Sequence, residues 1–232
     1  TVIGDRQAKK VVGLSIGNDA DALALALIDM EVRGAYREKV KTVTMDMSTA
    51  YISGVTISMP KAKIVFDRFH LVKKLNEGID KIRRREQKSY SALKKSRYLW
   101  LKNHDDLSKE KQLRVHELAR AYPTIGEAYR LKELFREVFN EADIKQANGR
   151  LNAWMDHDWK TKIKELHDFV AMLCRHWYGI KTYFKSRASN ALAERFNLKI
   201  QEIKRTAKGY RNMMNFMTMI YFHLGGLKLI TH

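Results

Sequence analysis

Apolar and polar positions alternate with the period of short strands at the beginning of the chain. Residues 1–16 predict two strands joined by the polar turn "DRQAKK". The stretch "ADALALALIDMEVRGA" then predicts a helix, with Asp19 or Asp21 as its cap and Gly34 as its stop. A second helix, "TAYISGVTISM", lies between the apolar strands "VKTVTMD" and "KAKIVFD" and ends before Pro60. This order of strands and helices predicts an α/β fold with a mixed sheet.

After His70 the strand pattern stops, and apolar residues recur with helical spacing. The first of these positions are Leu71, Leu75, Ile79 and Ile82. Helical signals continue for about a hundred residues. The capping box "TIGE", directly after Pro123, predicts the start of one of these helices. We therefore expect an all-helical insertion over residues 71–185.

Three tryptophans of this helical region, Trp154, Trp159 and Trp177, are interleaved with Leu and Ile. That arrangement favours a place in the helical core, with base stacking as the alternative. The single cysteine, Cys174, lies in an apolar stretch and is expected to be a small core residue. One cysteine excludes an internal disulfide framework and a Cys-based zinc cluster, which suits a reducing, cytosolic setting.

The stretch "SNALAERFNLKIQEIKRTAKGYRN" predicts a late helix with two different faces. Ser189 or Asn190 can cap it, and Gly209 can end it. The apolar stripe is Ala193, Phe196, Ile200, Ile203 and Ala207. A second stripe, on roughly the opposite face, is Glu194, Asn197, Gln201, Arg205 and Lys208. A carboxylate, two amides and two cations on one side of a helix suit a metal ion followed by a phosphate backbone.

The charge balance points to a polyanionic partner. Lys and Arg number 44 against 26 Asp and Glu, a net charge of +18, and nucleic acid is the commonest polyanion that a soluble protein meets. A solvated, highly charged surface is the alternative. The basic run "KIRRREQK", which contains Arg83, Arg84 and Arg85, is either a DNA-facing helix or such a solvated face. No apolar run is long enough for a membrane span, and no P-loop or Ser-His-Asp signature is present.

Three acids stand out because of their places in these elements. In "VTMDMSTAY", Asp46 ends a strand; Asp67 ends the next one, and Glu194 begins the polar stripe of the late helix. Strand ends fix side chains in place, and carboxylate oxygens suit the Mg²⁺ ions that assist phosphodiester chemistry. Plainer explanations remain open: turn or helix caps for the two Asp residues, and a solvated surface for the Glu. His70 is a ligand or proton shuttle, or else structural.

Longer motifs resemble a known family. "VTMDMSTAYISGV", "PKAKIVFDRFHLVKKLNE", "YLWLKN" and "SNALAERFNLKIQEIKRTAKGYRN" are similar to stretches of bacterial insertion-sequence transposases of the ISL3 family, in the family's order. The resemblance implies a ribonuclease-H-like core, with a mixed sheet and a large helical insertion, in which Asp, Asp and Glu hold two Mg²⁺ ions. It puts Asp46 at the second acid position and Glu194 at the third. Asp67 and His70 belong to the family's D-R-F-H motif and would support the site.

The resemblance also sets the expected domains and function. Residues 1–70 would begin the core, 71–185 would be the insertion, and 186–232 would complete the core with the Glu-bearing helix. The intact enzyme would cut transposon ends and join the freed 3′-OH to target DNA. The family pattern places the first Asp upstream of "TVIGD", so this chain is expected to be truncated and inactive alone. Asp5, in the hairpin turn, is not expected to replace it.

Further expectations follow from the same resemblance. The cofactor is Mg²⁺, with Mn²⁺ as a substitute, and the partners are DNA and further copies of the chain in a homo-oligomer. The setting is the bacterial cytoplasm, at the nucleoid. The amides and cations of the late helix would steady the DNA backbone. Two alternatives stay open: a catalytically dead DNA-binding remnant, and a general nuclease of the same fold.

Overall fold

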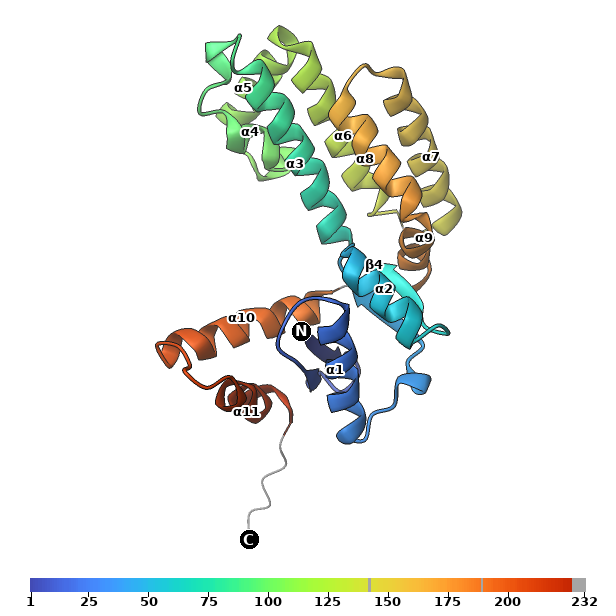
Figure 1. The fold of residues 1–232 in the computed structure, drawn as a ribbon. Coiled ribbons are helices and arrows are strands. Elements are labelled where there is room, and N and C mark those ends of the chain that lie inside the picture. The colour runs from blue at the N-terminus through green and yellow to red at the C-terminus, as the bar shows by residue number, and fades with distance from the viewer. Residues whose placement is uncertain (142, 189, 227–232) are drawn as a thin grey trace. The chain divides into compact units, whose positions relative to one another are not determined.

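The computed structural model shows an α+β chain in which helices predominate (Figure 1). The residues that it describes are 1–141, 143–188 and 190–226. The chain divides into two units, of which unit 1 is Thr1–Asp67 with Ala188–His232 and unit 2 is Arg68–Arg187. None of the described helices is long and apolar enough to cross a membrane.

Unit 1 contains two pairs of strands. β1 (Val2–Asp5) and β2 (Lys10–Leu14) form an antiparallel hairpin, whereas β3 (Thr42–Met45) and β4 (Lys63–Phe66) are parallel. The difference follows from the connections, because a tight turn reverses the chain and a crossover helix returns it in the same direction. In the described part of the chain these pairs are two separate two-stranded sheets, where the sequence predicts one mixed sheet.

The helices of unit 1 are α1 (Ala20–Val32), α2 (Thr49–Ser58), α10 (Ala191–Thr206) and α11 (Met213–Leu224). The first three begin and end close to the predicted signals, whereas α11 was not predicted. The cap of α1 is Asp19, whose carboxylate accepts a hydrogen bond of 2.8 Å from the Ala22 N–H, so Asp21 is not the cap. Gly34, at φ +87°, follows the helix in a backbone conformation that favours glycine.

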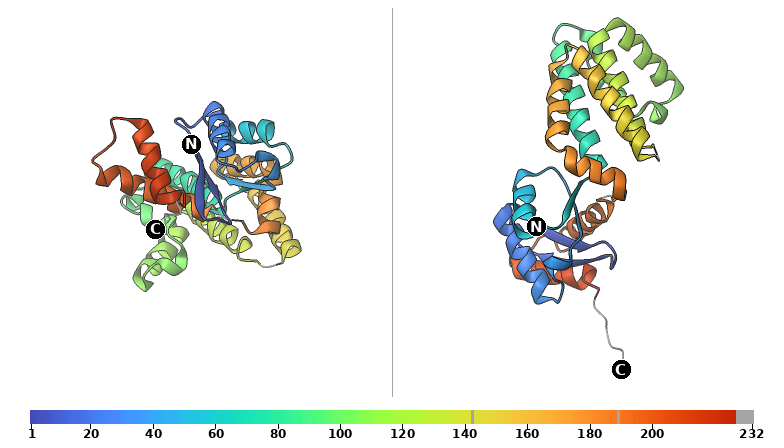
Figure 2. Two further views of the ribbon diagram at one scale, coloured as in Figure 1. Left: turned by 90° about the horizontal axis from the view of Figure 1, so that it is seen from below. Right: turned by 90° about the vertical axis from the view of Figure 1, so that its right-hand side faces the viewer.

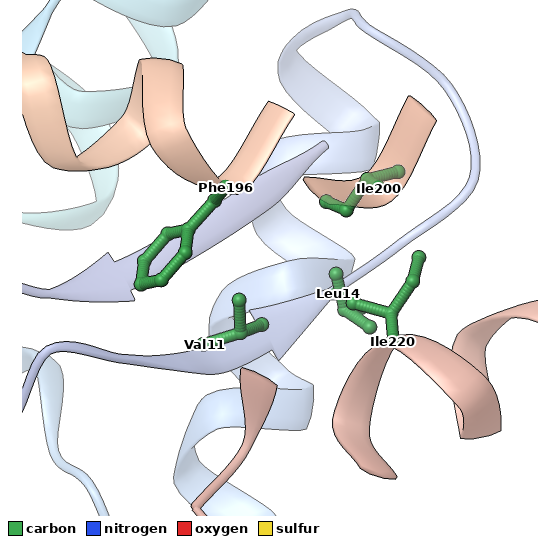
Figure 3. Packing of buried hydrophobic residues seen from close by; sticks show 5 residues of the cluster. All are labelled: Val11, Leu14, Phe196, Ile200 and Ile220. Carbon is green, nitrogen blue, oxygen red and sulfur yellow. The ribbon is translucent and has the colours of Figure 1, made fainter. Parts of the chain in front are cut away.

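One apolar cluster joins the β1–β2 hairpin to the two late helices (Figure 3). Its buried members are Val11, Leu14, Phe196, Ile200 and Ile220. Phe196 and Ile200 come from the predicted apolar stripe of α10, and Ile220 comes from α11. The Phe196 ring lies so close to Gly4 of β1 that a Cβ there would be 2.5 Å from it. Burial of this stripe therefore fixes the face that α10 presents away from the core.

The described residues of unit 2 form helices and the connections between them, as the views in Figure 2 also show. The α-helices are α3 (Arg68–Glu86), α4 (Arg97–Leu101), α5 (Lys109–Ala121), α6 (Pro123–Val138), α7 (Ile144–Lys160), α8 (Lys164–Arg175) and α9 (Trp177–Ser186). Helix α3 packs against α6 and α8, and Phe135 of α6 lies edge-on to Phe139 and Phe169. The helical spacing that begins at Leu71 is therefore a buried stripe of a helical unit.

Three predictions within unit 2 need correction. Helix α6 starts at Pro123, so Thr124 lies inside its first turn and makes no cap, and Glu127 instead pairs with Arg130. Trp154 is in the core and donates to the Leu131 carbonyl at 2.7 Å, but Trp159 is 55% exposed. Cys174 is also exposed rather than part of the core. Apolar sequence neighbours do not by themselves give the side of a helix that is buried.

Asp158, near the end of α7, gives a prediction for stability against pH. Neither carboxylate oxygen has a hydrogen-bond partner among the described residues, and the side chain is fully buried. Burial raises the pKa of Asp158 to about 6, although His167 and His157 nearby oppose that rise. The folded protein therefore holds this proton more tightly than the unfolded chain does. Its stability should fall as the pH rises from about 4 through about 6.

Asp158→Asn removes this titration and is expected to increase the free energy of unfolding at pH 7.5 by about 2 kcal/mol. At pH 4 most of the gain should disappear, because the carboxyl is then neutral in the folded protein and already partly protonated in the unfolded chain. Urea unfolding at the two pH values measures the difference. Asp156→Asn, an exposed change in the same helix, is the control. A gain that is the same at both pH values would contradict this explanation.

Candidate active site

Asp46 and Asp67 lie at the same end of one sheet. The parallel register pairs Met45 of β3 with Phe66 of β4, so each strand is followed at once by an aspartate. The Asp67 N–H donates to the Met45 carbonyl at 3.3 Å and extends the pairing by one residue. The strand-end position that the sequence predicts for both acids is therefore present in the fold.

Asp46 makes a turn that leads into α2. Its Oδ1 accepts a hydrogen bond of 3.1 Å from the Ser48 N–H, two residues ahead. Ser48, not Asp46, is the N-cap of α2, so the helix-cap alternative for Asp46 does not fit. Its Oδ2 makes no hydrogen bond within the described part of the chain, and the residue is half-buried. One carboxylate oxygen is thus held in place while the other remains available.

Asp67 ties the end of β4 to the start of α10. The carboxylate is 5% exposed, and its Oδ2 accepts a hydrogen bond of 3.1 Å from the Asn190 N–H. Asn190 is the N-cap position of α10, and its own side chain makes no capping bond. Ser189, the other predicted cap, lies outside the described residues. The Asp67 carboxylate therefore satisfies an N–H group at the start of the helix that carries Glu194.

Replacement of Asp67 by Ala is expected to lower the free energy of unfolding by about 1–3 kcal/mol, because it leaves the Asn190 N–H without its acceptor. Asp67→Asn keeps an oxygen at that place and should cost clearly less. Thermal or urea unfolding of both variants measures the difference. Stability of Asp67→Ala equal to that of the unaltered chain would show that this link does not hold α10.

Glu194 lies in the first turn of α10. Its N–H donates to the Asn190 carbonyl at 3.1 Å, so the residue sits one turn beyond the point that Asp67 binds. Its Oε1 is buried and has no hydrogen-bond partner among the described residues. A buried carboxylate oxygen without a partner is costly, and a cation would compensate for it. Its first-turn position also places the negative charge at the favourable end of the helix dipole.

The described residues do not bring three or more His, Cys, Asp or Glu side chains together closely enough to hold a metal ion. Asp46 and Glu194 are therefore not part of a complete three-acid cluster within them. Their chemistry nonetheless suits a hard cation, since each offers a carboxylate oxygen that makes no hydrogen bond with the described part of the chain. The arrangement offers candidate ligands but not a full set within the described residues.

The polar stripe of α10 is shorter than predicted. Asn197, Gln201 and Arg205 are exposed on the helix. Lys208 lies beyond its end at φ +51°, and the Gly209 N–H closes the helix with a bond of 2.9 Å to the Lys204 carbonyl. Ala207, placed in the apolar stripe by the sequence, is exposed. The prediction that helical spacing aligns Lys208 with Glu194 is wrong, because the helix has already ended.

The three arginines predicted to contact DNA from α3 all form ion pairs within unit 2. Arg83 is buried, and its Nη2 lies 2.8 Å from Asp80 Oδ1. Arg84 Nη2 lies 2.8 Å from Asp80 Oδ2, and Arg85 pairs with Glu165. Because the guanidinium of Arg83 is in the interior, it cannot face a DNA backbone. Arg84 and Arg85 keep exposed side chains. The i, i+3 spacing of Asp80 and Arg83 was a sequence signal for this pairing.

His70 belongs to α3 of unit 2, where its ring lies edge-on to Phe69 with 5.6 Å between the ring centroids. The residue is half-buried. The acids at the sheet edge and Glu194 belong to unit 1. The supporting role expected for His70 therefore stays a prediction.

The sequence of the chain is similar to those of known transposases. The ISL3 family model, described as "Transposase", matches residues 1–220. The transposase for insertion sequence element IS1001 of Bordetella parapertussis is 28% identical over 228 residues, 95% of this chain and 56% of that protein. The transposase for IS1557 of Mycobacterium tuberculosis (strain CDC 1551 / Oshkosh) is 26% identical over 257 residues, with 97% and 56% covered.

The chain thus spans about half the length of the curated relatives that it matches. No solved structure matches it. The family match nevertheless runs from the first strand to α11 and includes Asp46, Asp67 and Glu194. The chain belongs to the ISL3 family of insertion-sequence transposases.

Proposed function

We propose that this chain is part of the catalytic domain of a DDE transposase, which cuts DNA at the ends of an insertion sequence and joins the freed 3′-OH to target DNA. In this proposal Asp46 and Glu194 hold metal, and Asp67 positions the helix that carries Glu194. The observation that carries it is the buried Glu194 Oε1, which has no hydrogen-bond partner among the described residues. A phosphodiester substrate needs metal cations to stabilise its negative charge, and carboxylate oxygens are the ligands that hold such cations.

Mg²⁺, or Mn²⁺ in its place, would supply charge neutralisation at the attacking and leaving oxygens of the phosphodiester. The protein's own contribution is to hold the ligands. Asp46 is fixed by its bond to the Ser48 N–H, and Glu194 by the first turn of α10, which Asp67 holds at Asn190. Ligands preorganised in this way need little rearrangement when a metal and a DNA strand bind.

A ribonuclease-H-like fold is the second part of the proposal. The β1–β2 hairpin and the parallel β3–β4 pair are each only two strands wide within the described residues. Two-stranded sheets are marginal by themselves, and parallel strands are normally found inside larger sheets. One further strand, pairing with both, would give a single mixed sheet next to Asp46. We propose that this strand carries the first Asp of the three acids and that the chain without it is inactive.

DNA is the proposed substrate, and the exposed face of α10 is the proposed contact. Asn197, Gln201 and Arg205 lie on that face, and Lys208 lies just past the end of the helix. Side chains of these types bind phosphate and sugar oxygens, and such contacts position a DNA strand. Arg84 and Arg85 of unit 2 remain further candidates, whereas the burial of Arg83 removes it from the set.

Metal-dependent cleavage of DNA that carries the ends of the insertion sequence tests the proposal, in a version of the protein as long as its relatives. We expect cleavage with Mg²⁺ or Mn²⁺ and none with a chelator. The rival function, a DNA-binding remnant without chemistry, predicts binding that falls steeply with salt and does not respond to Mg²⁺. Binding of that kind with no cleavage in the full-length version would favour the rival.

A further inference from the structure

An exposed tryptophan ends α7 in unit 2. Trp159 is 55% exposed, whereas Trp154, on the same helix, is 4% exposed. The Trp159 ring packs against the His167 ring of α8, with 5.2 Å between the centroids and 37° between the planes. One side of the indole is thus supported by protein, and much of the ring remains open to solvent. An indole that is open on one face can stack against a further aromatic ring.

Hydrogen bonds and one buried side chain support the short connection from α7 to α8. The Thr161 N–H and Oγ1 both donate to the Asp158 carbonyl at 2.8 Å. Ile163 is 5% exposed and anchors the other end of the connection. The His167 Nε2 lies 3.1 Å from the same Asp158 carbonyl, which orients the ring beneath Trp159. The two rings are therefore a preformed platform, and a ligand that binds there has little ordering cost.

The connection that follows Trp159 is basic, and so is unit 2 as a whole. Lys160 and Lys162 are exposed, and no acidic residue lies between Trp159 and Lys164 in the sequence. Lys164 pairs with Asp168. Lys160 and Lys162 form no ion pair within the described residues, so their charges remain available to a ligand. Residues 68–187 carry 28 of the 44 Lys and Arg and 16 of the 26 Asp and Glu, which is +12 of the net +18. The positive charge of this unit therefore favours a polyanion as its partner.

We propose that Trp159, supported by His167, stacks on an unpaired nucleobase of a DNA strand, with Lys160 and Lys162 next to the flanking phosphates. The open indole can stack on any base, because every base offers a π-face. A base inside a duplex is already stacked on both sides, so the site favours a base that is unpaired or flipped out. This inference rests on the proposed function, in which DNA is the substrate, and it adds a site in the helical insertion.

Affinity for two DNA probes tests the inference: a duplex with one unpaired thymine, and the same duplex fully paired. Trp159→Ala is expected to weaken binding of the first probe about tenfold and of the second less than twofold. Trp159→Tyr keeps an aromatic ring and should restore most of the loss. Tyr98→Ala removes another exposed ring of unit 2, 67% exposed, and should change neither affinity. Fluorescence anisotropy of labelled DNA gives all the constants.

Each of the other results has a definite meaning. Equal weakening of both probes by Trp159→Ala, or no weakening of either, would overturn the stacking site while leaving the proposed DNA-cleaving function intact. If Trp159→Ala instead dissociates an oligomer in sedimentation and leaves both affinities unchanged, the ring is a protein contact, and the inference is overturned. Absence of binding to either probe in the unaltered protein would overturn the proposed function together with the inference.

Discussion

Asp46→Asn and Glu194→Gln are each expected to lower metal-dependent DNA cleavage by about a thousandfold or more in a version of the protein as long as its relatives. Each change keeps the shape of the side chain and removes one anionic ligand. Charge stabilisation by a bound metal is worth several kcal/mol in such reactions, and each 1.36 kcal/mol is a factor of about ten in rate. Loss of either ligand should therefore remove most of the rate.

The matched control is Asp21→Asn, which changes an exposed acid of α1 in the same unit and should leave cleavage unchanged. Thermal unfolding of all three variants separates loss of chemistry from loss of fold. Since Glu194 Oε1 is buried without a partner among the described residues, Glu194→Gln is expected to be at least as stable as the unaltered protein when no metal is present. Cleavage by Asp46→Asn within tenfold of the unaltered rate would show that Asp46 is not a ligand.

Phe196→Ala is expected to lower the free energy of unfolding by about 3–5 kcal/mol. The ring is 5% exposed and packs with Val11 and Ile200 in the cluster that joins the hairpin to α10. It also fills the space beside Gly4, where even a Cβ would be too close to it. Removal leaves a cavity that the strand backbone cannot easily close. Because Phe196 lies two residues after Glu194, cleavage should fall as well.

Urea unfolding measures this loss, and Leu198→Ala is the control on the same helix. Leu198 is 72% exposed, so its truncation should change stability by less than about 0.5 kcal/mol. If both variants lose the same amount, the change reflects helix propensity rather than packing of the buried stripe. If Phe196→Ala loses less than 1 kcal/mol, α10 is not held by this cluster in the way described.

Local signals were enough to predict the neighbourhood of the candidate site. Strand and helix patterns put Asp46 and Asp67 at strand ends, and the structure places them there on paired strands. The contact between Asp67 and Asn190 was beyond such signals, because the two residues are 123 positions apart in the sequence. Helix α11 was not predicted either, although its Ile220 completes the core cluster beneath α10.

The wrong predictions have definite physical causes. Trp154 and Trp159 are five residues apart, about 140° around a helix, so one core-facing stripe cannot bury both rings equally. Lys208 fits the helical stripe only if the helix continues, but left-handed backbone at that residue and at Gly209 ends it. Arg83 belongs to a basic run in the sequence, but its ion pair with Asp80, one turn earlier, lies in the interior. In each case a tertiary contact or the end of the helix overrides the helical spacing read from the sequence.

Binding of Mn²⁺ tests most directly whether Asp46 and Glu194 hold metal. We would measure it by calorimetry on the full-length version and on its Asp46→Asn, Glu194→Gln and Asp21→Asn variants, all shown to be folded. We expect binding by the unaltered protein and by Asp21→Asn, and binding at least tenfold weaker in the other two variants. Equal binding by all four, or no binding by the folded unaltered protein, would contradict this expectation.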